Sequence, residues 1–370
     1  MGAQVFKIKT ISEMEQDLLA KSDSSDVVGG KPVAHDANKI LSKQDVQRDI
    51  ATYARVLINV YCGWPFHNAI VKRKVLKKLL SFYKNAHEMT AKDLYNELKD
   101  VIAIIPDNHI WLNFDRRMAR CASGRKLNNV GKNLAQPNTM VTQMYPGNVA
   151  VIAFFRMYRD KWVADQLLAF KDSIDKSSAL IVDLRGNGGG SSRYSDKLAE
   201  YLFGAEVRSA KKTFVRNNPD AQRFLKMARP DGAWWDSVSG HGDPLLCPED
   251  SLTQFNAKDG YDKPIYILTD GKTGSSSEMF LLRMLHHPRV RVVGDNSAGM
   301  EVFGNMGTGF LPASNITFGI GMNYRELEFD NFELRGYKPD IKCKDGQDAF
   351  VVAMNDFQRQ SLMSNGGLVR

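Results

Sequence analysis

Short apolar runs that alternate with helix-like segments constrain the fold of this chain more than any other feature. Strands that are covered on both faces of a sheet read as continuous apolar runs. The runs here are NVAVIAFF, ALIVDL, PIYIL and RVRVVG, at residues 148–155, 179–184, 264–268 and 289–294. The alternation predicts an α/β fold with mostly parallel pairing in the core sheet.

Helical spacing fills the segments between these runs. Apolar residues recur at helical intervals in one segment at Val163, Leu167, Phe170 and Ile174. A second helix is predicted around Leu198, with Gly204 as its C-terminal stop. A third is predicted from Ser277 to His286.

The rest of the chain divides into three regions by composition. Residues 1–40 include KSDSSDVVGGKPVAHDANK, which is polar and aperiodic, and they are predicted to form a flexible N-terminal segment. Residues 41–105 carry three helical patterns and are predicted to form a small helical domain. Residues 106–370 are then the core domain, with an excursion at 205–262 whose Pro, Gly and Trp residues break the rhythm.

Charge and cysteine content argue against several classes of protein. The formal net charge of +8 is modest for 370 residues and no nucleic-acid-binding motif is present, so no nucleic-acid partner is predicted. The basic run KRKVLKK, residues 72–78, is predicted to form the solvent-exposed face of an amphipathic helix. The four cysteines form no CxxC pair, so no metal site and no disulfide framework are predicted.

Hydropathy predicts no membrane span. No stretch approaches the roughly 20 apolar residues that cross a bilayer, and the first residues lack the apolar core of a signal peptide. We therefore expect a cytoplasmic protein, although a periplasmic or secreted protein whose leader had been removed would read the same way. A homo-oligomer is compatible with the sequence.

Three consecutive serines lie in TDGKTGSSSEM, residues 269–279, directly after the run PIYIL. One interpretation is structural, because Ser275 and Glu278 have the spacing of a capping box. The other is chemical, because a side chain at a helix N-terminus lies where free N–H groups favour developing negative charge. A serine nucleophile there needs a base from elsewhere in the chain.

A glycine-rich loop, RGNGGG, follows the run ALIVDL. The loop does not match the dinucleotide-binding motif GxGxxG, because Ser191 stands where a third glycine belongs. It does not match the P-loop motif either, because Gly190 is followed by serine instead of lysine. A plain tight loop and an oxyanion hole both remain. In the second case the backbone N–H groups of Gly188 and Gly189 are the donors.

Of the seven histidines, His109 is the best placed to act as a base. It lies in IIPDNHIWL, a Pro-broken turn before a predicted strand. A packing or hydrogen-bonded role is the ordinary alternative for such a histidine. A carboxylate would be needed to hold its tautomer, and spacing alone does not select one from 42 acidic residues.

Five motifs in this order resemble the C-terminal (tail-specific) processing serine peptidases and their tricorn-like relatives. They are IPDNHIWL, ALIVDLRGNGGG, PIYILTDGKTGSSSE, RVVGDNSAG and FELRGYKPDI, and together they extend over about two thirds of the chain. The resemblance implies a ClpP/crotonase-like β/α superhelix with a small N-terminal helical domain. It also implies a peptide or protein substrate and no metal or organic cofactor.

The resemblance implies a role for individual residues. Ser275 matches the family's nucleophile, and Ser276 supplies an oxyanion N–H together with Gly189 or Gly188. In the bacterial branch a lysine acts as base, but Met300 stands at that position and cannot accept a proton. The tricorn-like branch uses histidine and glutamate, and the matching residues here are His109 and Glu333. Asn108 stands where some relatives carry a supporting serine.

The chain departs from the processing peptidases in one module. Too few residues lie between Leu112 and Asn148 for a PDZ domain, so specificity must come from elsewhere, including the excursion. There Trp234 and Trp235 either cover the cleft or pack the excursion itself. The sequence therefore predicts a PDZ-less serine endopeptidase, with a non-proteolytic binding protein or an acyl-transfer enzyme on the same crotonase-like fold as alternatives.

Overall fold

The chain divides into two units, each built from separate stretches of sequence. The computed structural model describes residues 9–30, 32, 35–113, 140–157, 161–206, 212–228, 241–247, 255–330 and 332–366. Unit 1 comprises Met1–Arg120, Lys212–Pro248 and Phe303–Glu326, and unit 2 comprises Cys121–Lys211, Glu249–Val302 and Leu327–Arg370. Trp234 and Trp235 lie outside the described residues.

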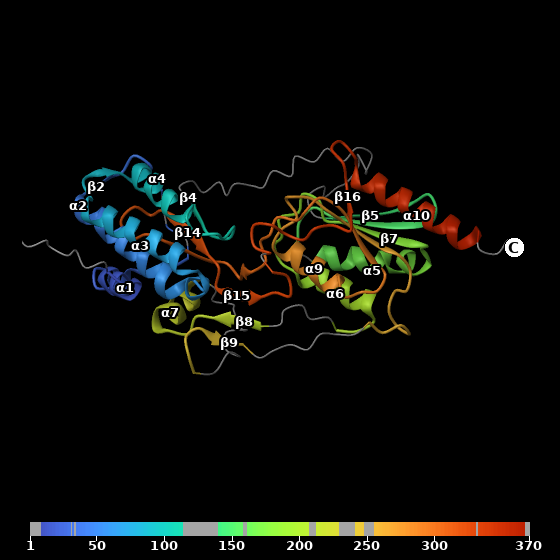
Figure 1. Cartoon of the computed structure of the whole chain (residues 1–370), viewed down its shortest axis with the longest axis horizontal. Coiled ribbons are helices and arrows are strands. Elements are labelled where there is room, and N and C mark those ends of the chain that lie inside the picture. Colours follow the sequence, from blue (N-terminus) through green and yellow to red (C-terminus); the bar gives the residue numbers. More distant parts are fainter. Residues whose placement is uncertain are drawn as a thin grey trace, which may run out of the picture. The chain divides into compact units, whose positions relative to one another are not determined.

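Unit 2 is built on a six-stranded sheet (Figure 1). Its order is β16 (Ile341–Lys342), β11 (Val290–Gly294), β10 (Ile265–Thr269), β7 (Ala179–Asp183), β6 (Val149–Phe154) and β5 (Met140–Tyr145). All neighbouring pairs are parallel except β5 with β6. The predicted α/β class and the mostly parallel pairing are therefore confirmed.

Alternate residues of each strand contribute side chains to two hydrophobic layers, one on each face of this sheet. One layer takes Ile152, Val182 and Ile267 and includes Phe280 of α9. The other takes Ile181 and Tyr266 with Ala353 and Phe357 of the C-terminal helix. The helices of the first layer are α5 (Lys161–Lys176), α6 (Arg193–Phe203) and α9 (Ser276–Met284), while α10 (Ala349–Gly366) covers the opposite face (Figure 1). Both faces are covered, which is why the strands read as continuous apolar runs.

The parallel pairing places two loops at one edge of the sheet. The carboxyl ends of β7 and β10 are neighbours, because Ile267 pairs with Val182 and Leu268 with Asp183. The glycine loop follows β7 and the serine turn follows β10. Ligand and catalytic sites of α/β sheets form at this edge, so the fold brings the two sequence motifs together.

Unit 1 contains the predicted helices of residues 41–105. They are α2 (Lys43–Arg55), α3 (Ala69–Lys84) and α4 (Ala91–Ile102), and one π-helical stretch, Val56–Val60, extends α2. The side chains of Ser42, Asn68 and Thr90 cap the N-termini of α2, α3 and α4, respectively.

The described part of the N-terminal segment contains more regular structure than its composition suggests. Residues Ile11–Leu19 form α1, which begins with a capping box between Thr10 and Glu13. Leu18 and Val27 are fully buried in unit 1. Burial of these few apolar side chains fixes a stretch that the polar composition led us to expect as flexible.

Two small antiparallel sheets bring distant segments into unit 1. One has the order β1 (Val28–Gly29), β13 (Gly307–Phe310), β14 (Thr317–Ile320) and β4 (Trp111–Asn113). The other has the order β12 (Phe303–Gly304), β15 (Asn323–Glu326), β8 (Lys212–Val215) and β9 (Leu245–Leu246). Within the excursion, β8 pairs with β9 and also with β15, which lies more than 100 residues further along the chain. Local composition did not indicate this long-range pairing.

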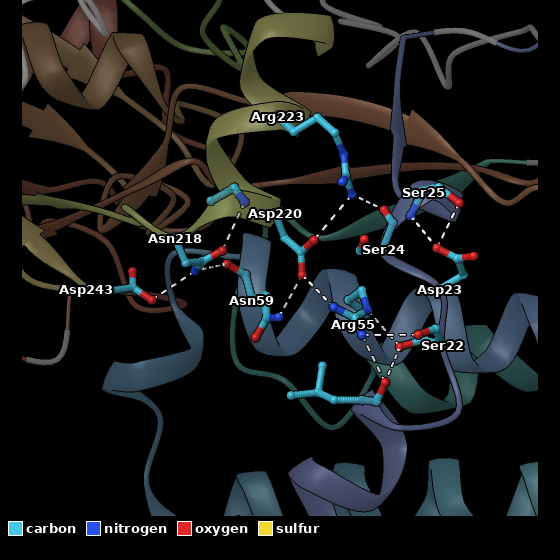
Figure 2. Close-up of polar contacts among 12 residues, drawn as sticks. Ser22, Asp23, Ser24, Ser25, Arg55, Asn59, Asn218, Asp220, Arg223 and Asp243 are labelled. Atoms are coloured by element: carbon cyan, nitrogen blue, oxygen red, sulfur yellow. Dashed lines mark hydrogen bonds and ion pairs between the residues drawn. The ribbon is translucent and has the colours of Figure 1, made fainter.

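A polar network ties the excursion to the helices of unit 1. Asp220, on α7 (Pro219–Ala228), is buried and accepts hydrogen bonds from Arg55 and Asn59, each at 2.8 Å (Figure 2). Arg55 also donates to the carbonyl oxygens of Leu19 and Ser22. A buried carboxylate with several donors is strongly stabilised relative to an unpaired one, so this network holds three chain segments together.

Among the described residues, no helix is both long enough and apolar enough to cross a membrane.

Candidate active site

Ser275 occupies a sharp turn between a strand and a helix. β10 ends at Thr269, and α9 begins at Ser276. The backbone of Ser275 has φ 52° and ψ −125°, a region that costs a non-glycine residue about 1–3 kcal/mol. Nucleophilic serines of many hydrolases occupy strained strand-to-helix turns of this kind. The strand, turn and helix start that the sequence predicted here are all present.

Ser276 presents a hydrogen-bond donor beside this serine. It is the first residue of α9, where backbone N–H groups have no partner within the helix. The described part of the chain offers its N–H no acceptor. Its hydroxyl donates to the carbonyl oxygen of Gly190 at 2.8 Å, so the serine turn is tied directly to the glycine loop.

Gly189 lies against the serine turn. A Cβ atom at this position would lie 2.8 Å from the carbonyl oxygen of Gly274 and from Ser275 Cβ, and 2.9 Å from Ser276 N. Its φ of +94° also favours glycine. The glycine therefore keeps open the space next to Ser275, which is where an oxyanion hole would be needed.

The two candidate glycine donors differ in their hydrogen bonds. The N–H of Gly189 donates to Asn187 Oδ1 at 3.0 Å. The N–H of Gly188 has no acceptor within the described ranges, and Gly188 is exposed. Asn187, which the sequence reading overlooked, is fully buried and also donates to the carbonyl oxygen of Phe154 at 3.0 Å. Its position between glycines was the available signal for a loop-shaping role.

Met300 lies against the serine turn from another side. Its Sδ atom is 3.1 Å from the position that a Cβ on Gly274 would take. The Met300 side chain therefore contacts the residue before Ser275, and a thioether has no proton to exchange.

Glu333 lies in the same unit as Ser275. It is half-buried, and its Oε2 accepts the N–H of Val302 at 3.3 Å. The next residue, Leu334, donates its N–H to the carbonyl oxygen of Gly299 at 2.9 Å. The segment that carries Glu333 therefore packs on residues 299–302, which also adjoin the serine turn.

His109 belongs to unit 1, and the structure describes the two units separately. Its side chain is buried, and its backbone N–H donates to Asp107 Oδ1 at 2.6 Å. Burial lowers the pKa of His109 to about 4, with a smaller contribution from the Arg325 charge. The structure thus brings Ser275, Ser276, Gly188, Gly189 and the Glu333 segment into one unit, and it places His109 in the other.

Asp107 is a second residue that the sequence reading did not single out. It accepts from Tyr61 Oη at 2.8 Å as well as from the His109 backbone. Burial raises the pKa of Asp107 to about 7. The Asp–x–His spacing of PDNH was the available signal, since an aspartate commonly accepts from the N–H two residues on.

Comparison with solved structures finds similarity at low sequence identity. A candidate peptidase from Parabacteroides merdae ATCC 43184 is 17% identical, with a TM-score of 0.55, and the alignment covers 86% of this chain and 97% of that one. A lipoprotein from Streptococcus agalactiae is 13% identical, with a TM-score of 0.47 and the same coverage. No curated protein matches significantly. At these identities the likeness to the first structure shows the fold alone.

A match to a protein-family model shows the family to which the chain belongs. Residues 148–343, more than half of the chain, match peptidase family S41. The matched segment contains the glycine loop, Ser275 and Glu333, while His109 precedes it. The resemblance to C-terminal processing and tricorn-like peptidases is confirmed by this match. The chain belongs to peptidase family S41 and is a serine-type peptidase.

Proposed function

We propose that this chain is a serine endopeptidase in which Ser275 is the nucleophile, His109 the general base and Glu333 the residue that orients His109. The observation that carries the proposal is the backbone of Ser275, which holds a strained positive φ at the N-terminus of α9. Strain of this kind persists where the surrounding structure holds it, and such residues cluster at active sites. Peptides or proteins are the substrates.

The proposed reaction follows the acyl-transfer route. Ser275 Oγ attacks the scissile carbonyl carbon while its proton passes to His109. The tetrahedral oxyanion is held by the N–H groups of Ser276 and of the glycine loop. Collapse expels the amine, which takes the proton from His109. Water then attacks the acyl-enzyme carbonyl and gives a proton to His109. The ester bond breaks, the acid product leaves, and His109 returns the proton to Ser275 Oγ.

The hydrogen bonds of the loop favour Gly188 over Gly189 as the second oxyanion donor. The Gly189 N–H is already bonded to Asn187, whereas no described residue accepts from Gly188. Gly189 then serves to keep the hole open, since a side chain there would fill it. Both glycines are required, but for different reasons.

His109 suits the role of a base because it is neutral at physiological pH. Burial lowers its pKa to about 4, so its imidazole is in the neutral form that a general base needs. In this proposal Glu333 holds the tautomer and offsets the imidazolium charge that forms as Ser275 attacks.

A fluorophosphonate probe tests the nucleophile. Intact mass is measured on wild type, Ser275→Ala, His109→Ala and Ser277→Ala. We expect one adduct on wild type and on Ser277→Ala, and none on the other two at matched times. Ser277 is a close control, because its buried hydroxyl has no hydrogen-bond partner among the described residues. An adduct on Ser275→Ala would show that Ser275 is not the residue that reacts with the probe. No adduct on folded wild type would favour a non-proteolytic binding protein.

A further inference from the structure

Glu278 is a fully buried carboxylate in the first turn of α9. Its Oε2 accepts the N–H of Ser275 at 3.1 Å and the N–H of Met300 at 2.7 Å. Its Oε1 accepts the N–H of Gly299 at 2.7 Å. An ordinary capping-box glutamate reaches back only to its own N-cap residue. Glu278 does this and also binds a separate loop.

The number and kind of these donors explain how a carboxylate tolerates this position. Burial raises the pKa of Glu278, and hydrogen bonds from Ser297 and from three backbone N–H groups counteract that effect. Bonds to an ionised acceptor are about twice as strong as neutral ones. Removing one oxygen would leave a buried N–H without its acceptor, which is costly.

The loop that Glu278 binds also holds the segment that carries Glu333. Gly299 accepts the N–H of Leu334 through its carbonyl oxygen at 2.9 Å, and Val302 donates its N–H to Glu333 at 3.3 Å. Gly299 has φ +69°, and a Cβ there would lie 2.6 Å from the backbone nitrogen of Arg335. The contact between the loop and this segment is therefore close.

The same loop runs beside the serine turn. The N–H of Ala298 donates to the carbonyl oxygen of Thr273 at 2.8 Å, and the side chains of Ala298 and Met300 approach Gly274. Residues 297–302 thus lie between the turn that carries Ser275 and the segment that carries Glu333. All of these contacts fall within unit 2.

We propose that Glu278 is a positioning residue that fixes the Ser275 turn relative to the Glu333 segment through the loop 297–302. The catalytic consequence rests on the proposed function, in which Ser275 and Glu333 act in one site. Glu278 itself touches no reacting atom. Its two oxygens set the spacing between a nucleophile and a carboxylate that lie 58 residues apart in sequence.

Glu278→Gln is the variant of choice, because glutamine has nearly the same shape. It carries one oxygen and one NH₂ group, so in either orientation at least one of the three backbone N–H groups faces a donor. Asp356→Asn is the matched control. Asp356 is a buried carboxylate in the same unit that accepts from Tyr266 at 3.0 Å and from Arg291 at 2.6 Å.

Two measurements on the full chain separate the parts of the proposal. Hydrogen exchange of Ser275, Gly299, Met300 and Leu334 amides reports the positioning without any need for activity. We expect exchange at these amides to be at least about 10-fold faster in Glu278→Gln, because an acceptor is lost, and unchanged in Asp356→Asn. Peptide hydrolysis reports the consequence. We expect kcat to fall about 10- to 100-fold from misplacement of the reacting groups, with KM unchanged.

Each outcome bears on one claim. Unchanged exchange in Glu278→Gln would overturn the positioning role. Faster exchange spread evenly over unit 2, or a KM change without a kcat change, would also overturn it. If wild type forms no Ser275 adduct while Glu278→Gln shows the localised exchange, the proposed peptidase mechanism fails and the tie between the two segments stands.

Discussion

Gly189 and Ser275 approach so closely that no side chain fits between them. A Cβ atom on Gly189 would lie 2.8 Å from the Cβ of Ser275, well inside ordinary van der Waals contact. Gly189 follows β7 and Ser275 follows β10, and these two strands are neighbours in the sheet. The core sheet therefore sets the distance between the glycine loop and the serine.

Gly189→Ala is expected to abolish fluorophosphonate labelling of Ser275. The added methyl group would fill the space beside Ser276 N, and its positive φ would cost an alanine about 1–3 kcal/mol. Labelling rate and thermal unfolding are measured together, so that a folded but unreactive protein can be recognised. Gly271→Ala is the control, because a Cβ there meets nothing within 4 Å. Equal labelling of both variants would contradict the assigned oxyanion space.

The pH dependence of labelling should reflect the buried His109. A base must be neutral, and burial lowers the pKa of His109 to about 4. The rate is therefore expected to hold as pH falls through 6.5, the ordinary value for histidine, and to decline only near pH 4. Circular dichroism at each pH confirms that the protein is folded.

A decline near pH 7 would contradict this and would point to Asp107, whose pKa is raised to about 7 by burial. Asp107→Asn separates the two cases. If protonation of Asp107 causes the decline in labelling rate, the decline disappears in this variant. If protonation of His109 causes it, the decline remains.

The core of unit 2 could be predicted from the sequence, because its strands are buried on both faces. β6, β7, β10 and β11 coincide with the four apolar runs. Gly204 is the C-cap of α6 and has φ +64°, as its position after a helical pattern predicted. These features depend on neighbours in the sequence, and local patterns therefore reveal them.

The fold of unit 1 could not be predicted from the sequence in the same way. Its β8 pairs with β15, and β4 pairs with β14, across long stretches of chain. Strands of two to four residues that contain glycine, such as β13 with GTGF, carry too little alternation to be recognised. The hydrogen bonds of Asn187 to Phe154, and of Glu278 to Gly299 and Met300, likewise join groups far apart in sequence, so spacing alone does not reveal these partners.

Glu333→Gln is expected to lower the labelling rate by about 10²- to 10⁴-fold if Glu333 orients the base, since neutralising the orienting carboxylate of a triad has effects of this size. Asp340→Asn is the matched control. Asp340 is a carboxylate on the same segment that also accepts one backbone N–H, that of Val292, at 2.7 Å. Similar rates for the two variants would remove Glu333 from the proposed triad and leave the orienting residue to be found.

Asp220→Ala is expected to destabilise unit 1 strongly. Asp220 is buried and accepts from Arg55 and Asn59, and Figure 2 shows the two donors converging on its carboxylate from another part of the chain. Removing one partner of a buried ion pair costs about 3–5 kcal/mol, because the other charge stays buried without compensation. Hydrogen exchange at the amides of α2 and α7 should therefore accelerate by roughly two to four orders of magnitude, at about 1.4 kcal/mol for each factor of ten. Asp100→Ala removes an exposed partner of Lys78 at 3.3 Å and should change stability by only about 0–1 kcal/mol. Comparable exchange in the two variants would show that the Asp220 network does not hold the excursion to the helices.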